Sequence, residues 1–210
     1  MQSGGNTLSR SLTALVFPGF ETLDLFGPLE MFGSLPGEFS IRTVSERPGP
    51  VTSCHGQTIV ADAGFQNILE SDLILVPGGP GTPLENPCAA TNSWLRRMAR
   101  NDALMMGVCT GSALLACAGL LAGRRATTNK MCFDWATSFG PDVDWIAQAR
   151  WVEDGNIITS SGVSAGMDMS LAVIARLLGN PAAVQVAGIT EYDWHDDPSW
   201  DPFAEHYGLI

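Results

Sequence analysis

Charged residues are scarce in this sequence, and basic residues are the scarcer kind. Only 16% of the 210 residues are charged, and 11 Lys and Arg stand against 22 Asp and Glu, for a formal net charge of −11. Such a chain repels a phosphate backbone over most of its surface, and its adjacent basic pairs lie only at 96–97 and 124–125. We therefore expect no nucleic-acid partner. The low charged fraction also indicates extra buried surface, such as a subunit interface.

Paired cysteines and long apolar runs are also absent. The five cysteines are odd in number and form no CxxC pair, so we predict neither a disulfide framework nor a structural zinc site. The longest weakly polar run, 113–122, is too short and too interrupted by glycine to cross a bilayer. Residues 1–10 are polar and lack the apolar segment of a signal peptide. We expect a flexible tail there, one domain over 11–210, and a cytoplasmic protein without a membrane partner.

What the sequence does contain is an alternation of short apolar runs with helical patterns. Several of the runs, such as LILV at 73–76, are apolar throughout, which is typical of parallel strands buried on both faces. The alternation predicts a doubly wound α/β fold, a mostly parallel sheet with helices on both faces. We expect strands at 11–17, 39–44, 58–61, 73–76, 103–108, 151–153 and 157–160. We expect helices from about Pro28 to 35, at 92–100 with Asn92 as its cap, and at 111–118, 130–139, 164–178 and 181–189.

Three turns fall at the carboxyl ends of predicted strands, where sites form in sheets of this kind: 19–24, 78–81 and 109–111. Cys109 lies between a buried strand and a helix. A residue in such a sharp turn is pushed above the sheet edge, often with a strained backbone, and Gly111 lets the turn close. The helix N-terminus then favours a thiolate and lowers the thiol pKa. The sequence therefore predicts a nucleophile elbow at Cys109, whose thiol should be the most reactive of the five.

The alternative for any free cysteine is a buried apolar role. We assign that role to Cys117 and Cys132, and only surface or packing roles to the loop residues Cys54 and Cys88.

Four motifs, in order along the chain, resemble those of the ThiJ/PfpI superfamily. They are LDLFGP at 23–28, VPGG at 76–79, GVCTGS at 107–112 with AGLLAGRRATT at 118–128, and SGVSAGMD at 161–168. The resemblance runs from about Ser11 to Tyr192. It implies a flavodoxin-like fold of the class I glutamine amidotransferase type. The branch most similar is isocyanide hydratase, and the same turn and elbow occur in the sensory half of AraC-type regulators.

The resemblance also implies roles for the residues around Cys109. Asp24 matches the position of an acid that meets the cysteine sulfur; near a thiolate it would be protonated and act as a general acid. A helix-start cap is the alternative for Asp24. Gly79, in the turn with Gly78, would offer a backbone N–H to developing negative charge, with the N–H of Thr110 as its partner. The Thr110 hydroxyl would orient substrate or water, unless it only bonds locally.

The sequence departs from the superfamily's patterns at two places. No histidine follows Cys109 as in protease-like members, and we assign surface or structural roles to His55, His195 and His206, so a protease is not expected. Where isocyanide hydratases tend to have His-Trp after Ala-Thr-Thr, this chain has Asn129-Lys130.

Together these features predict an isocyanide hydratase-like enzyme that acts on a small molecule. Cys109 would form a thioimidate, and an N-substituted formamide would leave, without metal or organic cofactor. A non-catalytic or redox- or ligand-sensing domain is the first alternative, and a glyoxalase- or amidase-like hydrolase is the second. The superfamily's habit of pairing near the active site, with the low charged fraction, predicts a homodimer.

Overall fold

The computed structural model describes residues 9–82 and 89–210. Within these residues a seven-stranded sheet has the order β10-β11-β7-β6-β1-β2-β5, and every neighbouring pair is parallel except β10 and β11. The strands are β1 (Arg10–Leu15), β2 (Phe39–Ser45), β5 (Ala63–Gly64), β6 (Leu73–Val76), β7 (Leu104–Val108), β10 (Trp151–Asp154) and β11 (Ile157–Ser160). Because β1, β6 and β7 are parallel, their carboxyl ends lie at one edge of the sheet, next to the point beside β1 where the strand order reverses.

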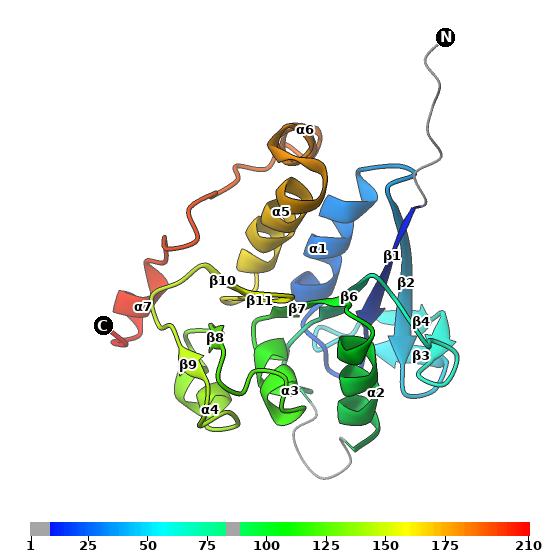
Figure 1. The fold of residues 1–210 in the computed structure, drawn as a ribbon, viewed down its shortest axis with the longest axis horizontal. Coiled ribbons are helices and arrows are strands. Elements are labelled where there is room, and N and C mark those ends of the chain that lie inside the picture. Colours follow the sequence, from blue (N-terminus) through cyan, green and yellow to red (C-terminus); the bar gives the residue numbers. More distant parts are fainter. Residues whose placement is uncertain (1–8, 83–88) are drawn as a thin grey trace.

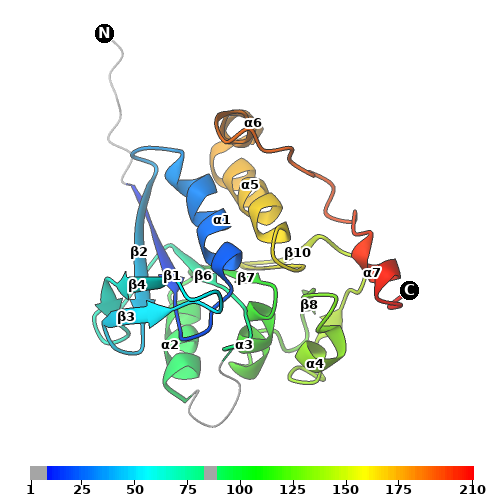
Figure 2. The ribbon, with the colours of Figure 1, turned by 180° about the vertical axis from the view of Figure 1, so that it is seen from behind.

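Helices cover both faces of this sheet. On one face α1 (Thr22–Gly33) packs beside α5 (Ala165–Leu178), with α6 (Asn180–Ile189) outside it, and on the other lie α2 (Ala89–Arg100) and α3 (Gly111–Cys117) (Figures 1 and 2). All residues of β6 and β7 are buried, as expected for strands covered twice. The predicted doubly wound, mostly parallel α/β fold is confirmed. No helix in the described ranges is long and apolar enough to cross a membrane.

Smaller elements flank the main sheet. The antiparallel hairpin of β3 (Gly49–Thr52) and β4 (Thr58–Ala61) lies beyond one end, and the parallel pair of β8 (Arg125–Ala126) and β9 (Asp144–Trp145) lies with α4 (Phe133–Thr137) near the other (Figure 1). The sequence analysis predicts β4 but misses β3, β5, β8 and β9, since two- to four-residue strands carry almost no periodic signal.

Two predicted helix starts are wrong. The first helix begins at Thr22, not near Pro28, which lies inside α1. Gly27, just before Pro28, lies where α1 packs against α5: a Cβ there would come within 2.8 Å of Met167 Cγ. The other helix, α2, begins at Ala89, so Asn92 is an interior residue and not its cap.

The helix predicted at 130–139 is shorter than expected, because only Phe133–Thr137 is helical. The Asn129 side chain accepts a hydrogen bond from the Cys132 N–H at 3.0 Å and so forms a turn where the helix was predicted to begin. This turn brings Asn129 into the site described below.

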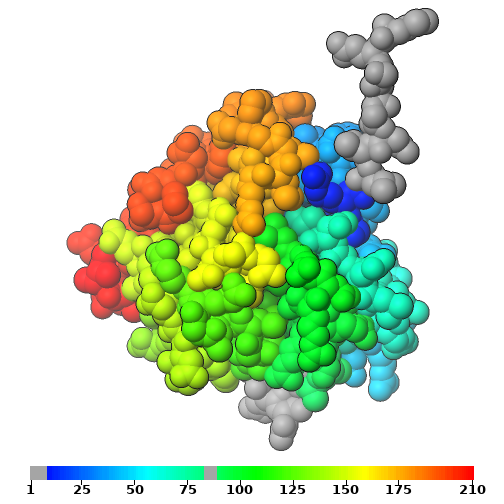
Figure 3. Space-filling view, viewed as in Figure 1, coloured from blue at the N-terminus to red at the C-terminus, as the bar shows by residue number. Residues whose placement is uncertain are grey.

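The C-terminal segment is anchored by one buried carboxylate. Asp168, at the start of α5, pairs with Arg150 at 2.7 Å and accepts hydrogen bonds from the Tyr192 hydroxyl and the His195 N–H at 3.0 and 3.1 Å. Burial, followed by the charge of Asp168, raises the pKa of Tyr192 to about 12. Farther along the chain, the Pro198 carbonyl accepts a hydrogen bond from the Arg150 N–H at 2.7 Å. In Figure 3 the red C-terminal segment packs against the yellow-green surface that precedes β10. The tail thus belongs to the folded body.

Candidate active site

The predicted elbow is present at the carboxyl end of β7. Cys109 has φ 56°, the left-handed region that a residue with a Cβ rarely adopts. Its N–H donates to the carbonyls of Ser160 and Ser161, at 3.2 and 3.3 Å, and its own carbonyl accepts the Ser112 and Thr128 hydroxyls. These bonds hold the strained residue between β7, α3 and the end of β11. Backbone strain of this kind is characteristic of functional sites.

Three hydrogen-bond donors surround the sulfur. Asn129 Nδ2 donates to Cys109 Sγ at 3.2 Å, and the backbone N–H groups of Thr110 and Val163 also bond to it. Of these donors the sequence predicts only the Thr110 N–H, which comes with the helix start. Asn129 and Val163 lie on separate loops and reach the sulfur through tertiary packing alone.

The loop that carries Val163 is itself shaped for this contact. Val163 has φ 45°, an unfavourable conformation for a β-branched residue. Next to it, a Cβ on Gly162 would lie 2.4 Å from Asn129 Nδ2, so only glycine leaves room for the amide that donates to sulfur. Both residues belong to the SGVSAGMD motif, to which the sequence analysis gives no role.

Asp24 lies in the first turn of α1 with its side chain fully buried. It does not cap the helix: Oδ2 accepts the Gly78 N–H at 2.9 Å, from the turn after β6. Oδ1 has no hydrogen-bond partner among the described residues. Because Oδ2 is already an acceptor, a proton on the carboxyl group would reside on Oδ1.

Asp24 and Cys109 shift one another's pKa. Burial is the main cause that raises the pKa of Asp24 to about 7. The hydrogen bond from the Gly78 N–H lowers this pKa, the charge of Glu21 raises it, and the hydrogen bond with the Cys109 thiol lowers it. Burial also raises the pKa of the Cys109 thiol, and the charge of Asp24 raises it further, against the Thr110, Val163 and Asn129 donors. The predicted lowering of the thiol pKa is therefore wrong: Cys109 is only 5% exposed, and desolvation outweighs the helix terminus.

The two glycines of the 78–81 turn are placed beside Cys109 but are not free donors. The Gly78 N–H donates to Asp24, and the Gly79 N–H donates to Thr110 Oγ1 at 2.9 Å. The Thr110 hydroxyl also bonds to Thr82 at 2.9 Å, so its partners lie in the turn after β6 and not in its own helix, and its role toward substrate or water stays a prediction. An oxyanion role for Gly79 would require its bond to Thr110 to open.

These glycines instead let three turns touch through their backbones. A Cβ on Gly78 would meet Thr110 Oγ1 at 2.4 Å, one on Gly79 would meet the Glu21 N at 2.4 Å, and one on Gly111 would meet the Val76 carbonyl at 2.1 Å. The Gly79 φ of 126° adds a second reason for glycine there. The expected requirement for Gly111 at the elbow thus has a direct cause in close packing.

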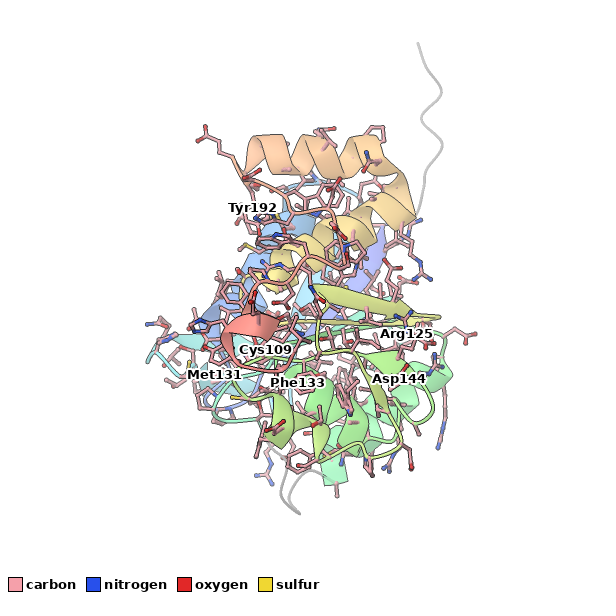
Figure 4. The ribbon with its side chains drawn as sticks, turned by 90° about the vertical axis from the view of Figure 1, so that its left-hand side faces the viewer. Cys109, Arg125, Met131, Phe133, Asp144 and Tyr192 are labelled. Atoms are coloured by element: carbon pink, nitrogen blue, oxygen red, sulfur yellow. The ribbon has the colours of Figure 1, made fainter. Side chains whose placement is uncertain are left out.

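A cavity of about 330 Å³ opens onto Cys109. One wall is formed by the turns, with Glu21, Gly79, Pro80 and Thr110, and the facing wall by the following residues: Asn129, Met131, Cys132, Trp135 and Val163. Figure 4 shows Cys109 and Met131 close to one another on the side of the molecule where α7 (Phe203–His206) lies. The cavity suits a small, partly apolar molecule and places the sulfur at its floor.

Comparison with known proteins identifies the family of the chain. Residues 10–176 match the model of the DJ-1/PfpI family. The chain belongs to that family. It is 36% identical to the isonitrile hydratase of Pseudomonas putida over 180 residues, which cover 85% of this chain and 76% of that one.

Other members of the DJ-1/PfpI family resemble the chain as well. The regulator CdhR of Pseudomonas aeruginosa, described as HTH-type, is 32% identical over 184 residues, or 86% of this chain but only 54% of that protein. A solved ThiJ/PfpI family protein of Pseudomonas syringae superimposes with a TM-score of 0.81 at 33% identity, covering 96% of this chain and 84% of the other. Family membership thus includes both enzymes and regulators.

In this DJ-1/PfpI family member the structure shows what Asn129 and Lys130 do, the two residues at which the sequence departs from isocyanide hydratases. Asn129 bonds to the sulfur, whereas Lys130 turns away into a buried ion pair, with Nζ 3.4 Å from Asp201 of the C-terminal segment and 2.6 Å from Thr127 Oγ1. Burial lowers the pKa of Lys130 to about 8, against the attraction of Asp201. Lys130 therefore fixes the cavity wall to the tail. None of the three histidines lines the Cys109 cavity, and Cys88 lies outside the described residues.

Proposed function

We propose that this protein is a cysteine-dependent hydratase that converts isocyanides to N-substituted formamides. The observation that carries the proposal is the Asp24–Cys109 pair: a sulfur on a strained elbow interacts with a buried carboxyl group whose pKa is raised to about 7. A group that titrates near neutral pH both accepts and returns protons there. The match to the P. putida isonitrile hydratase supports the choice of substrate class.

The proposed chemistry needs only this pair and one water molecule. The sulfur of Cys109 adds to the terminal carbon of R–N≡C, and its proton passes through Asp24 to that carbon, forming a thioimidate, S–CH=N–R. Water then adds to the same carbon as Asp24 relays a proton to nitrogen. The C–S bond breaks, the remaining hydroxyl proton returns to sulfur, and R–NH–CHO leaves. No redox change occurs, and the net reaction consumes one isocyanide and one water.

The cavity supports this chemistry by its shape and lining. Met131, Trp135 and Val163 offer apolar surface to the R group. The Asn129, Thr110 and Val163 donors would stabilise negative charge on sulfur as the C–S bond forms and breaks.

The test is steady-state turnover of alkyl and aryl isocyanides, with the formamide measured by mass spectrometry. We expect turnover by the unaltered chain, none by Cys109→Ser, and a loss of about 10²–10⁴-fold in Asp24→Asn, the contribution of a general acid or base. Cys132→Ser is the matched control, because Cys132 is a second thiol that lines the same cavity and has no role in the proposed steps. Equal turnover by Asp24→Asn and the unaltered chain would overturn the mechanism.

A sensory role is the second candidate, and the regulator CdhR supports it. In that case Cys109 reacts once with oxidant and is not regenerated, so mild peroxide would give stoichiometric sulfinic acid at Cys109 while no isocyanide is consumed. The homodimer and the cytoplasmic location stay predictions; light scattering at micromolar concentration tests the first.

A further inference from the structure

A second cluster of chemistry-bearing side chains lies beside the Cys109 cavity. Glu21 precedes α1, and Cys54 and His55 lie in the loop between β3 and β4. Each offers one metal-ligating atom, and these atoms all lie within 4.8 Å of one another. We propose that Glu21, Cys54 and His55 form a zinc-binding site.

The spacing of the three side chains fits a tetrahedral ion. Cys54 Sγ lies 3.2 Å from Glu21 Oε2 and 3.6 Å from His55 Nδ1, and His55 Nδ1 lies 3.5 Å from Glu21 Oε1. With Zn–S of about 2.3 Å and Zn–N or Zn–O of about 2.0–2.1 Å, tetrahedral angles place neighbouring ligand atoms about 3.3–3.6 Å apart. The Sγ–Nδ1 separation is close to such an edge, and the Glu21 carboxylate, whose Oε2 faces Cys54 and whose Oε1 faces His55, brings one oxygen to the third corner by a small rotation.

The backbone holds the ligands in place without a metal. The Cys54 N–H donates to the Phe20 carbonyl at 2.9 Å, and the Glu21 N–H donates to the Gly78 carbonyl at 2.8 Å, so both loops are fastened to the turns of the candidate active site. Within the hairpin loop, the Gln57 side chain donates to the His55 carbonyl at 2.8 Å. Ligands on fastened loops lose little conformational entropy when an ion binds.

The site is open to solvent on one side. The His55 side chain is 61% exposed, whereas that of Glu21 is 18% exposed, so an ion can enter past the imidazole. Thr22 Oγ1 lies 3.0 Å from His55 Nδ1 and donates to Gln57 at 3.1 Å; the ion would replace the first of these contacts. No fourth His, Cys, Asp or Glu joins the cluster within residues 9–82 and 89–210. The fourth position is left to water or to a donor atom of a small molecule.

The donor set selects the metal. A thiolate with an imidazole and a carboxylate suits zinc, whereas Mg²⁺ and Ca²⁺ prefer oxygen ligands alone. Binding converts the Cys54 thiol to thiolate and releases one proton to solvent. No sequence pattern indicates this site, because Glu21 and Cys54 are 33 residues apart and form no CxxC or HxxxH spacing.

The experiment is a titration of the purified metal-free protein with Co²⁺, a spectroscopic substitute for zinc, followed by competition with Zn²⁺. We expect one ion per chain, a sulfur-to-cobalt charge-transfer band, and displacement of the band by stoichiometric zinc. Cys54→Ser should abolish the band. Glu21→Gln and His55→Ala should each weaken binding by more than the roughly 10–100-fold that follows loss of an outer-shell partner.

Two matched variants decide whether the ion lies at the proposed cluster. Cys109→Ser and Cys132→Ser remove the two thiols that line the cavity and should leave the band unchanged. A band that persists in Cys54→Ser, or one that disappears in Cys109→Ser, overturns the assignment. Failure of the unaltered chain to bind one Co²⁺ ion per chain also overturns the assignment. Because Cys54 takes no part in the proposed hydration, isocyanide turnover by metal-free protein tests the two proposals separately.

Discussion

Replacing Asp24 by asparagine should stabilise the protein at alkaline pH more than at acidic pH. The carboxyl group is fully buried, one of its oxygens has no partner among the described residues, and its pKa rises from 3.8 to about 7. Ionising this group therefore costs more free energy in the folded protein than in the unfolded chain. Asparagine has nearly the same shape and no charge to bury.

The sign and the size follow from the two pKa values. Below pH 3.8 both states hold the proton, and the carboxyl contributes no pH dependence. As the pH rises, the unfolded carboxyl ionises first while the folded one keeps its proton, so folded stability is lost until the pH passes about 7. A difference of about three pKa units corresponds to about 4 kcal/mol in total. Between about pH 5.5 and about pH 8 the loss is about 2 kcal/mol.

Urea denaturation of both proteins at those two pH values measures this loss. The free energy of unfolding of Asp24→Asn minus that of the unaltered chain should grow by about 2 kcal/mol from the lower to the higher pH. Taking this difference cancels any constant cost of the amide. Leu25→Ala, a buried neighbour without a titratable group, should lose about 2–5 kcal/mol equally at both. An Asp24→Asn effect that is the same at both pH values would refute the raised pKa.

Three further results follow from the site. Asp24→Asn should speed alkylation of Cys109 above about pH 7, because the ionised Asp24 carboxylate raises the pKa of the thiol there and asparagine carries no charge; equal rates in the two proteins would contradict the coupling. Asn129→Ala should slow alkylation of Cys109 about 10-fold or more, because hydrogen bonds to charged groups contribute about 1.5–3 kcal/mol. Gly162→Ala should slow it likewise by displacing the Asn129 amide. Mass spectrometry of labelled Cys109 measures both rates, and unchanged rates would exclude the amide as a thiolate donor. Lys130→Met should cost about 3–5 kcal/mol of unfolding free energy by leaving Asp201 buried and unpaired, and adding Asp201→Asn should restore part of it; an additive double variant would show that the pair does not interact.

The sequence predicts those parts of the site that depend on local order. Cys109 follows a strand that is buried on both faces and precedes a helix with glycine at its first position, so its place in the turn follows from a few neighbouring residues. The same holds for the Gly78–Gly79 turn after β6. Asp24 is found through the resemblance of its motif, and the structure shows the carboxyl buried beside the thiol.

The other parts depend on packing between distant segments. Asn129 and Val163 are 20 and 54 positions from Cys109, and neither lies in a pattern that points toward the sulfur. The direction of the thiol pKa was also beyond local reasoning, because the elbow fixes the helix terminus but not how much water remains around the sulfur. Likewise, nothing near Glu21 in the sequence indicates Cys54.

The close backbone packing of the three turns gives the cavity one part that resists change, whereas the 131–135 segment tolerates it. Side chains larger than hydrogen at Gly78, Gly79 or Gly111 collide with main-chain or side-chain atoms of the neighbouring turns, so substitution there disturbs the turn that holds Cys109. Met131 and Trp135, on the facing wall, are instead largely exposed. Exchanging them changes the space offered to a ligand and leaves the elbow untouched. Selection for a new substrate would therefore act on the 131–135 segment, and a library for altering specificity belongs there.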